Sequence, residues 1–144
     1  MMDWQKVSLV SHYQTAIAIQ NEMLSGNLEE AEIGLEELIE ALSRSDKRAL
    51  KSQLVRLMMH IIKWKTQPQK RSFSWVASIN NAREEILEIQ EETPSLNDNV
   101  IQQMWDKCFK IAQRQARAEM NQKTELEALS WSEVFEDEYE IEAF

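Results

Sequence analysis

The side chains of this sequence that are best suited to chemistry lie along one side of a helix expected over residues 47–66. Arg56, His60 and Lys63 are spaced four and three residues apart, so their side chains share one face of a helix. A histidine between two cations is pushed toward its neutral form, which suits a proton acceptor or a hydrogen-bonding group. The pattern therefore indicates a polar line that could receive an anion.

Neighbouring segments supply further groups that could complete a pocket. Two glutamates lie one turn apart on a helix expected just before, and would face His60 if the two helices pack side by side. Two arginines follow in a loop and on the next helix, and two tryptophans could form apolar walls around an anionic ligand. The candidate polar site comprises Glu37, Glu40, Arg56, His60, Lys63, Trp64, Arg71, Trp75 and Arg83.

A structural role suits the same side chains, with acids and bases paired between helices and His60 hydrogen-bonded at the edge of the core. These residues do not define a reaction, so catalytic residues stay unknown and whether the chain is an enzyme stays open. Glycine-rich phosphate loops, Gly-x-Ser-x-Gly and His-Glu-x-x-His are absent. Leucine precedes both histidines by three residues, unlike a di-iron bundle, and Cys108 alone cannot build a structural zinc site. We expect no metal and no cofactor.

The composition predicts an all-α fold. Only two Gly and two Pro occur in 144 residues, too few for the turns of a sandwich or barrel, and apolar residues recur at intervals of three and four. We expect a single-domain bundle of about five helices plus a short C-terminal helix. Residues 1–123 would form the bundle, and residues 124–144 an acidic tail docked on the same domain. The helices are expected over residues 3–25, 28–43, 47–66 and 72–92, from Thr93-Pro94 to about 118, and after Ser130.

Each expected helix carries an apolar stripe that is predicted to be buried. Gly34 stands in mid-helix, which close contact with a neighbouring helix would explain. A break is expected at residues 43–46, where serines could cap a new helix. The predicted stripes are Leu9, Tyr13, Ala16, Ile17 and Leu24; Leu28, Ala31, Leu35, Leu38 and Leu42; and Leu50, Leu54, Leu57, Ile61 and Trp64.

Charge is distributed in blocks of alternating sign, with a formal net charge of −9. Residues 28–43 hold six acids and no base, whereas residues 44–71 hold nine bases and one acid. Net acidity makes nucleic acid an unlikely partner, because phosphate affinity comes mainly from Lys and Arg. No apolar run approaches the length of a membrane span, and no signal peptide is recognisable. With a single Cys, which permits no internal disulfide, we expect a cytoplasmic protein.

The same residues resemble a known family. Arg44-Ser45-Asp46-Lys47-Arg48, His60-Ile61-Ile62-Lys63-Trp64, Gln67-Pro68, Ser74-Trp75, Ile79, Arg83 and Pro94-Ser95-Leu96 are similar, in that order, to the cyanobacterial family known as domain of unknown function 29. The likeness spans nearly the whole chain, although Leu38 replaces a usual acid and Ser43 a common glycine. It implies an all-helical single domain, carries no established activity, and suggests His60, Lys63, Trp64, Trp75 and Arg83 for testing first.

The function is unknown from these residues, and two hypotheses stay open. The first is a cytoplasmic helical protein-interaction or regulatory module, because catalytic signatures are missing and the acidic tail carries Trp131, Phe135, Tyr139 and Phe144, as a docking peptide would. The second is a small enzyme or anionic-ligand-binding protein with a site around His60, Lys63 and Arg83. A protein partner is expected and a small anionic ligand is the alternative; the oligomeric state is unknown.

Overall fold

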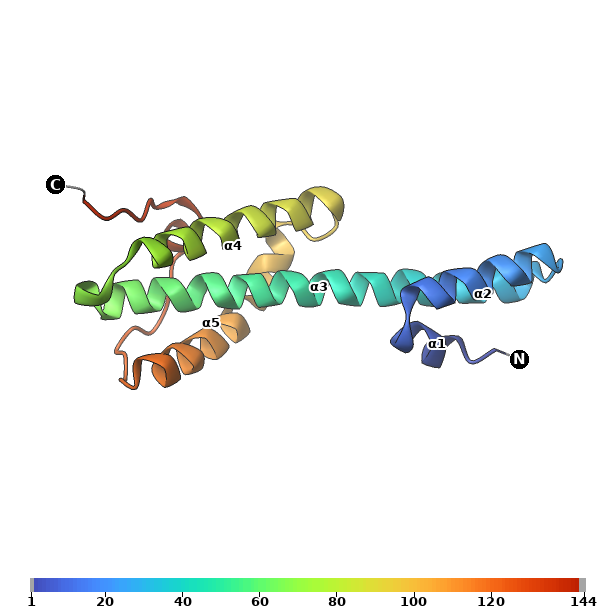
Figure 1. The fold of residues 1–144 in the computed structure, drawn as a ribbon, viewed down its shortest axis with the longest axis horizontal. Helices are drawn as coiled ribbons and strands as arrows, with labels where there is room; N and C mark the ends of the chain where they lie inside the picture. Colours follow the sequence, from blue (N-terminus) through green and yellow to red (C-terminus); the bar gives the residue numbers. More distant parts are fainter. Residues whose placement is uncertain (1, 143–144) are drawn as a thin grey trace. The chain divides into compact units, whose positions relative to one another are not determined.

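The computed structural model describes residues 2–142 of the chain, and they are all-α, as the sequence predicts (Figure 1). No strand occurs among these residues. Five α-helices are joined by short connections, with a 3₁₀ turn and a π turn between and after them. Their bounds are α1 Trp4–Val10, α2 His12–Leu24, α3 Leu28–Thr66, η1 Pro68–Lys70, α4 Phe73–Glu92, α5 Asp98–Met120 and η2 Ser132–Glu136.

The first expected helix is interrupted at Ser11, so the prediction of one helix over residues 3–25 is wrong. Ser11 has extended backbone angles (φ −159°, ψ 123°) and ends α1. Its hydroxyl oxygen accepts from the amide of Gln14 at 3.1 Å and so caps α2. Serine followed three residues later by glutamine is the sequence pattern of a capping box. A local hydrogen bond therefore redirects the chain between two helices.

The predicted break at residues 43–46 does not occur, because α3 continues through it from Leu28 to Thr66. This stretch contains neither Gly nor Pro, and Ser and Asp inside a helix cost only a few tenths of a kcal/mol each. A serine caps a helix only where the backbone leaves the helical conformation. The helix instead ends one residue before Gln67-Pro68, where the sequence predicts it.

The last long helix starts later than Thr93-Pro94, the start that the sequence predicts. Thr93 caps the C-terminal end of α4, with its amide donating to the carbonyl of Ile89. Asn97 caps α5 instead, with its side-chain oxygen accepting from the amide of Val100 at 3.2 Å. Leu96 is buried just before the cap, so the intervening turn is held by an apolar contact.

The chain divides into two compact units, residues 1–48 and residues 49–144. The C-terminal unit has a large apolar core, to which α3 gives Leu57, Ile61 and Trp64, α4 gives Ile79 and Ile86, and α5 gives Ile101 and Cys108. Leu57 and Ile61 are 0% exposed, so the predicted central stripe is confirmed. Leu129 and Val134 from the segment after α5 are also buried in this core.

The N-terminal unit has a much smaller core, formed by Trp4, Ile19 and Ala31. Gly34 of α3 lies beside it, and a Cβ atom there would stand 2.7 Å from Cζ3 of Trp4 and 2.8 Å from Cγ1 of Ile19. The indole nitrogen of Trp4 also donates to Oε1 of Glu30 at 2.9 Å. Close packing on this glycine, as the sequence predicts, lets the unit assemble.

Two of the predicted buried stripes are exposed, which corrects the sequence interpretation. Four of the five residues predicted to bury the first helix are large apolar side chains at the surface, and Leu24 is 81% exposed. On α3, Ala31 is buried but Leu28, Leu35 and Leu42 are exposed. α2 buries Thr15 and Ile19 instead, because these two lie on the side that meets Trp4 and α3. None of the described helices is both long and apolar enough for a membrane span.

Candidate functional site

His60 lies on α3 at the edge of the C-terminal core and is half-buried. Its Nδ1 atom is buried and has no hydrogen-bond partner among the described residues. Burial lowers the pKa of the imidazole, and the nearby charges of Lys63 and Arg56 lower it further, while Glu119 acts in the opposite direction. The neutral form is therefore favoured, as the sequence predicts.

Lys63 is occupied on both sides by groups from other helices. Its ammonium Nζ lies 3.1 Å from Oε2 of Glu119 on α5. It also lies 5.0 Å from the centre of the Trp75 ring on α4, within the range of a cation–π contact. Lys63 thus joins three helices of the unit, and its charge is already partly compensated.

Arg71 folds back on the end of α3. Its Nε donates to the backbone carbonyl of Trp64 at 2.9 Å, and its guanidinium carbon lies 4.6 Å from the centre of the Trp64 ring. The last carbonyls of a helix have no partner within the helix. Arg71 therefore satisfies one of them and covers the indole at the same time.

Arg83 of α4 holds the segment that follows α5. Its Nε donates to the carbonyl of Val134 at 2.8 Å and its Nη2 to the carbonyl of Glu133 at 3.3 Å. The guanidinium carbon also lies 5.5 Å from the centre of the Tyr139 ring. We call residues 129–141, which this arginine fixes to the core, the strap. Burial lowers the pKa of Arg83, against the effects of Tyr139 and Asp137.

Further contacts of the strap involve the aromatic and acidic side chains of its own sequence. The Tyr139 hydroxyl donates to the Glu133 carbonyl at 2.6 Å, and its ring meets Trp64 edge-on at a centroid distance of 5.5 Å. The Glu133 carboxylate pairs with Lys65 and accepts from the amide of Ser130. These hydrogen bonds lower the pKa of Glu133, whereas burial raises that of Tyr139 to about 12.

The structure brings together only part of the predicted site. Trp64 and Arg71 are in contact, and so are Lys63 and Trp75. Arg83 contacts the strap instead, and Arg56 is exposed on α3. Glu37 and Glu40 belong to the N-terminal unit. They lie on the same helix as His60, so the two neighbouring helices that would have let these acids face the His60 line are one helix in the structure.

One known family matches most of this chain. The model of a family described as domain of unknown function DUF29 matches residues 10–140. The chain belongs to this family. The match covers residues 10–48 of the N-terminal unit and residues 49–140 of the C-terminal unit of this DUF29 chain, and so includes most of its strap. No curated protein and no solved structure matches it.

The strap residues that bind the cations of this DUF29 chain could not be found from the sequence pattern. Glu133 and Val134 use their backbone carbonyls toward Arg83, and a carbonyl leaves no mark on the side-chain pattern. Glu119 was missed because it lies among basic residues near the end of α5. The spacing of Trp131, Phe135 and Tyr139 by four residues was the one available signal. The residues that the structure describes contain no group of three His, Cys, Asp or Glu side chains able to hold a metal ion.

Proposed function

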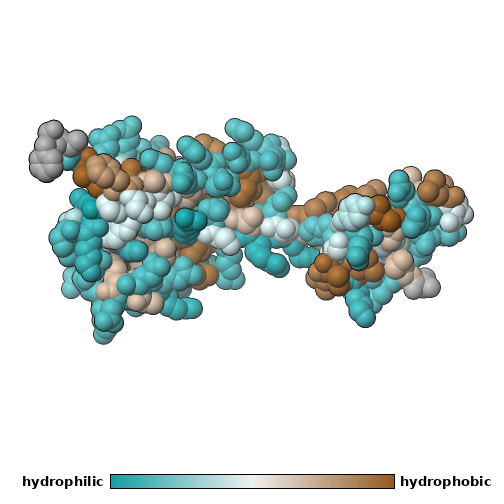
Figure 2. Space-filling view, in the orientation of Figure 1, coloured by the Kyte–Doolittle hydropathy of each residue, from teal (hydrophilic) through white to brown (hydrophobic). Residues whose placement is uncertain are grey.

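We propose that this protein is a helical interaction module whose N-terminal unit binds a partner protein through an apolar surface. The observation that carries this proposal is where the exposed large apolar side chains lie. Of the fourteen among the described residues, twelve fall between positions 2 and 42, and Figure 2 shows hydrophobic surface over this unit. Large exposed apolar patches on soluble proteins mark binding sites.

The spacing on α3 defines the shape of the expected partner. Leu28, Leu35 and Leu42 are seven residues apart, Ile39 lies between the last two, and all four are exposed. We call these four residues the leucine stripe. A repeat of seven keeps side chains along one line of a helix and is how coiled-coil helices meet each other. A partner helix packed along α3 is the natural occupant.

Charge beside the stripe selects the class of partner. Glu29, Glu32, Glu36 and Glu40 are exposed on the same stretch of α3, and no base occurs between residues 28 and 43. A second copy offering the same stripe would set these four glutamates against the same four. Like charges across a helix pair destabilise it, whereas Lys or Arg would pair with the acids. The proposed partner is therefore an amphipathic helix with basic flanks.

The tail is a less suitable binding element than the sequence indicates. Trp131, Phe135 and Tyr139 pack against the chain's own core, while Phe144 lies outside the described residues. Leu129 and Val134 are buried beneath them, so a deletion of residues 124–144 would expose the core and weaken the unit itself. Point substitutions on the leucine stripe are the sharper test.

A synthetic helical peptide with a leucine repeat and lysine flanks provides the probe. We expect fluorescence anisotropy to report saturable binding to the full chain that weakens as salt is added. Leu35→Ser combined with Leu42→Ser should weaken binding at least tenfold. Each leucine that the bound peptide would bury contributes about 1.5–3 kcal/mol to the binding free energy. Leu87→Ser is the matched control, since Leu87 is 58% exposed but belongs to the C-terminal unit.

Three outcomes would count against the proposal. A peptide with the same leucines and glutamate flanks that binds equally well would remove the charge argument. An equal loss of peptide affinity in Leu87→Ser and in the stripe variant would show that the peptide binds exposed apolar side chains non-specifically. A chain that dimerises in sedimentation and becomes a monomer when the stripe is changed would make a second copy the occupant.

The alternative, an anionic ligand at His60, Lys63 and Arg83, has one supporting feature, the unpartnered Nδ1 of His60. Against it, Lys63 is engaged by Glu119 and Arg83 by two strap carbonyls. Such a ligand would have to displace contacts that stabilise the unit. NMR chemical shifts of the His60 imidazole that change on titration with a carboxylate or phosphate would support this alternative. Unchanged chemical shifts would exclude it.

The compartment that we propose is the cytoplasm. Cys108 is a free and buried thiol, and burial raises its pKa, so it stays protonated and unreactive. A chain stabilised by packing alone and carrying such a thiol suits a reducing environment. Fractionation of cells that express the tagged full chain would test this.

A further inference from the structure

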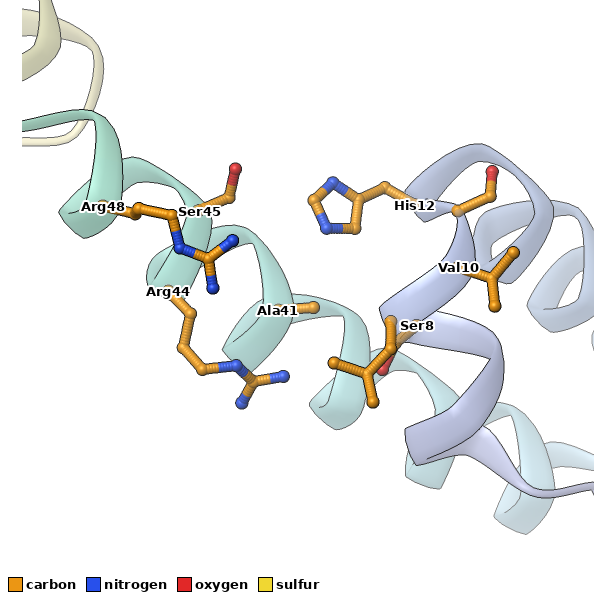
Figure 3. A pocket seen from close by; sticks show the side chains of 9 residues that line it. Ser8, Val10, His12, Ala41, Arg44, Ser45 and Arg48 are labelled. Carbon is orange, nitrogen blue, oxygen red and sulfur yellow. The ribbon is translucent and has the colours of Figure 1, made fainter. Parts of the chain in front are cut away.

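A cavity of about 290 Å³ lies within the N-terminal unit, where the junction of α1 and α2 approaches α3 (Figure 3). One wall is the face of α3 formed by Ala41, Arg44, Ser45 and Arg48, which are spaced three, one and three residues apart. The other wall runs from Ser8 to His12. Figure 3 shows the imidazole of His12 and the guanidinium groups of both arginines directed toward the hollow between these walls.

The polar groups of this cavity are donors rather than acceptors. Arg44 and Arg48 each present a guanidinium, and the lining contains no acid. Among the described residues, Arg44 pairs weakly with one carboxylate, its Nη1 atom lying 3.8 Å from Oε2 of Glu40. The Ser11 oxygen accepts from the amide of Gln14, which leaves its hydroxyl hydrogen free to donate. Ser8 differs, because it already donates to the carbonyl of Gln5.

We infer that this cavity binds a phosphoryl group through Arg44, Arg48, His12, Ser11 and Ser45. Two guanidinium groups one turn apart can each offer paired N–H donors to phosphate oxygens, and the two hydroxyls and the imidazole add single donors. A monoanionic carboxylate has too few oxygens to engage all of them. The lining of the cavity shares no residue with the leucine stripe or with the His60 line.

The apolar part of the lining indicates that the phosphoryl group is carried by a small organic molecule. Leu9 and Val10 make part of the wall that runs from Ser8 to His12 apolar, and Ala41 lies on the opposite wall. A phosphate ion fills roughly the volume of one to two water molecules, each of about 30 Å³. The cavity, at about 290 Å³, has room for much more than this ion. A phosphate monoester with an uncharged, partly apolar remainder uses both the donors and the apolar wall.

The test is a titration of the full chain followed by amide NMR at constant ionic strength. The probes are inorganic phosphate, phenyl phosphate and acetate. We expect saturable shifts confined to residues 8–12 and 41–48 with both phosphates, and tighter binding of phenyl phosphate. Arg44→Gln combined with Arg48→Gln should weaken binding roughly tenfold or more, since charged hydrogen bonds are lost. Arg114→Gln is the matched control, because Arg114 is an exposed arginine of α5 that belongs neither to the cavity nor to the candidate site around His60.

The two phosphates distinguish a free ion from an ester. Saturable binding of both with the expected loss in the double variant supports the site, and equal affinities would assign it to the free ion. Shifts that grow linearly with concentration, acetate that binds as tightly as phosphate, or an equal loss in Arg114→Gln would overturn it. Retention of phosphate binding in the Leu35→Ser and Leu42→Ser chain would separate this site from the proposed partner surface.

Discussion

The indole ring of Trp4 lies directly over the backbone of Gly34, in the space where any other residue would place its Cβ atom. Such a Cβ atom would stand 2.7 Å from Cζ3 of Trp4, closer than two side-chain carbon atoms can approach. Trp4 is almost completely buried there and is held at its far side by Glu30. The small core of the N-terminal unit therefore depends on a residue without a side chain.

Gly34→Ala tests this contact. Alanine gains up to about 1 kcal/mol of helix propensity, but forcing a methyl group into a packed core costs about 1–3 kcal/mol, so we expect net destabilisation. Hydrogen exchange of α1 and α2 amides would measure it. In a Trp4→Ala background the same change should cost less, because the indole is gone. Equal effects in both backgrounds would contradict the packing argument.

Arg83→Lys should loosen the strap while keeping the charge. Lysine cannot reproduce the two donors that reach the carbonyls of Val134 and Glu133, and a lost charged hydrogen bond costs about 1.5–3 kcal/mol. We expect exchange of residues 129–141 to accelerate by tenfold or more in mass spectrometry. Arg56→Lys, on an exposed arginine, is the control and should leave that rate unchanged. An unaltered strap in the Arg83 variant would refute the assignment.

Tyr139 should titrate far above the ordinary range of a phenol. Its pKa is raised from 10.0 to about 12 by burial, against the opposing charge of Arg83. A group with a raised folded pKa stabilises the fold fully below its unfolded pKa, and this contribution is lost as pH rises toward 12. In Tyr13→Phe, absorbance near 295 nm then reports Tyr139 alone. Ionisation at the unfolded value would mean that the ring is not packed under Arg83.

His60 provides the acid-side counterpart. Its pKa is lowered mainly by burial, then by Lys63 and Arg56. A base with a depressed pKa favours the fold above its unfolded pKa of 6.5, and this stability is lost as pH falls through the lower folded value. Urea unfolding at pH 7 and pH 5 should show a smaller difference in His60→Gln than in the parent chain.

Removal of one neighbouring charge isolates its effect. Lys63→Met should raise the pKa of His60, because a repelling cation is lost while the carboxylate of Glu119 remains. NMR titration of the imidazole would measure the change, with His12 in the other unit as an internal reference. A pKa of His60 that stays constant or falls would show that Lys63 does not act on the ring.

The C-terminal half of α3 and all of α4 could be predicted from the sequence because their signals agree. The stripe through Leu57 and Ile61, the stop at Pro68 and the serine cap at Ser72 all favour the same conformation. Serines at 43 and 45 misled because they can either cap a helix or lie inside one. Packing against residues distant in the sequence decides between a capped break and a continuous helix, and a local sequence pattern holds no information about that packing.

The apolar stripes of α2 and the first half of α3 show a different limit. Their periodicity correctly predicts one-sided helices, but a one-sided pattern does not say what covers the apolar side. Leu24 and Leu28 are exposed for that reason. The candidate site was partly predictable, since Lys63, Trp64, Arg71 and Trp75 form contacts. The carbonyl partners of Arg83 were not, because backbone atoms are the same in every residue.

The position of the strap has a consequence for biosynthesis. Leu129 and Val134 fill the core between helices that are all translated before them. A nascent chain paused on the ribosome before these residues emerge would leave Leu57, Ile61 and Ile86 without their final cover. The C-terminal unit would then finish folding only after residue 139 has emerged from the ribosome. A chaperone that holds unfolded chains would have its best opportunity to bind just before that point.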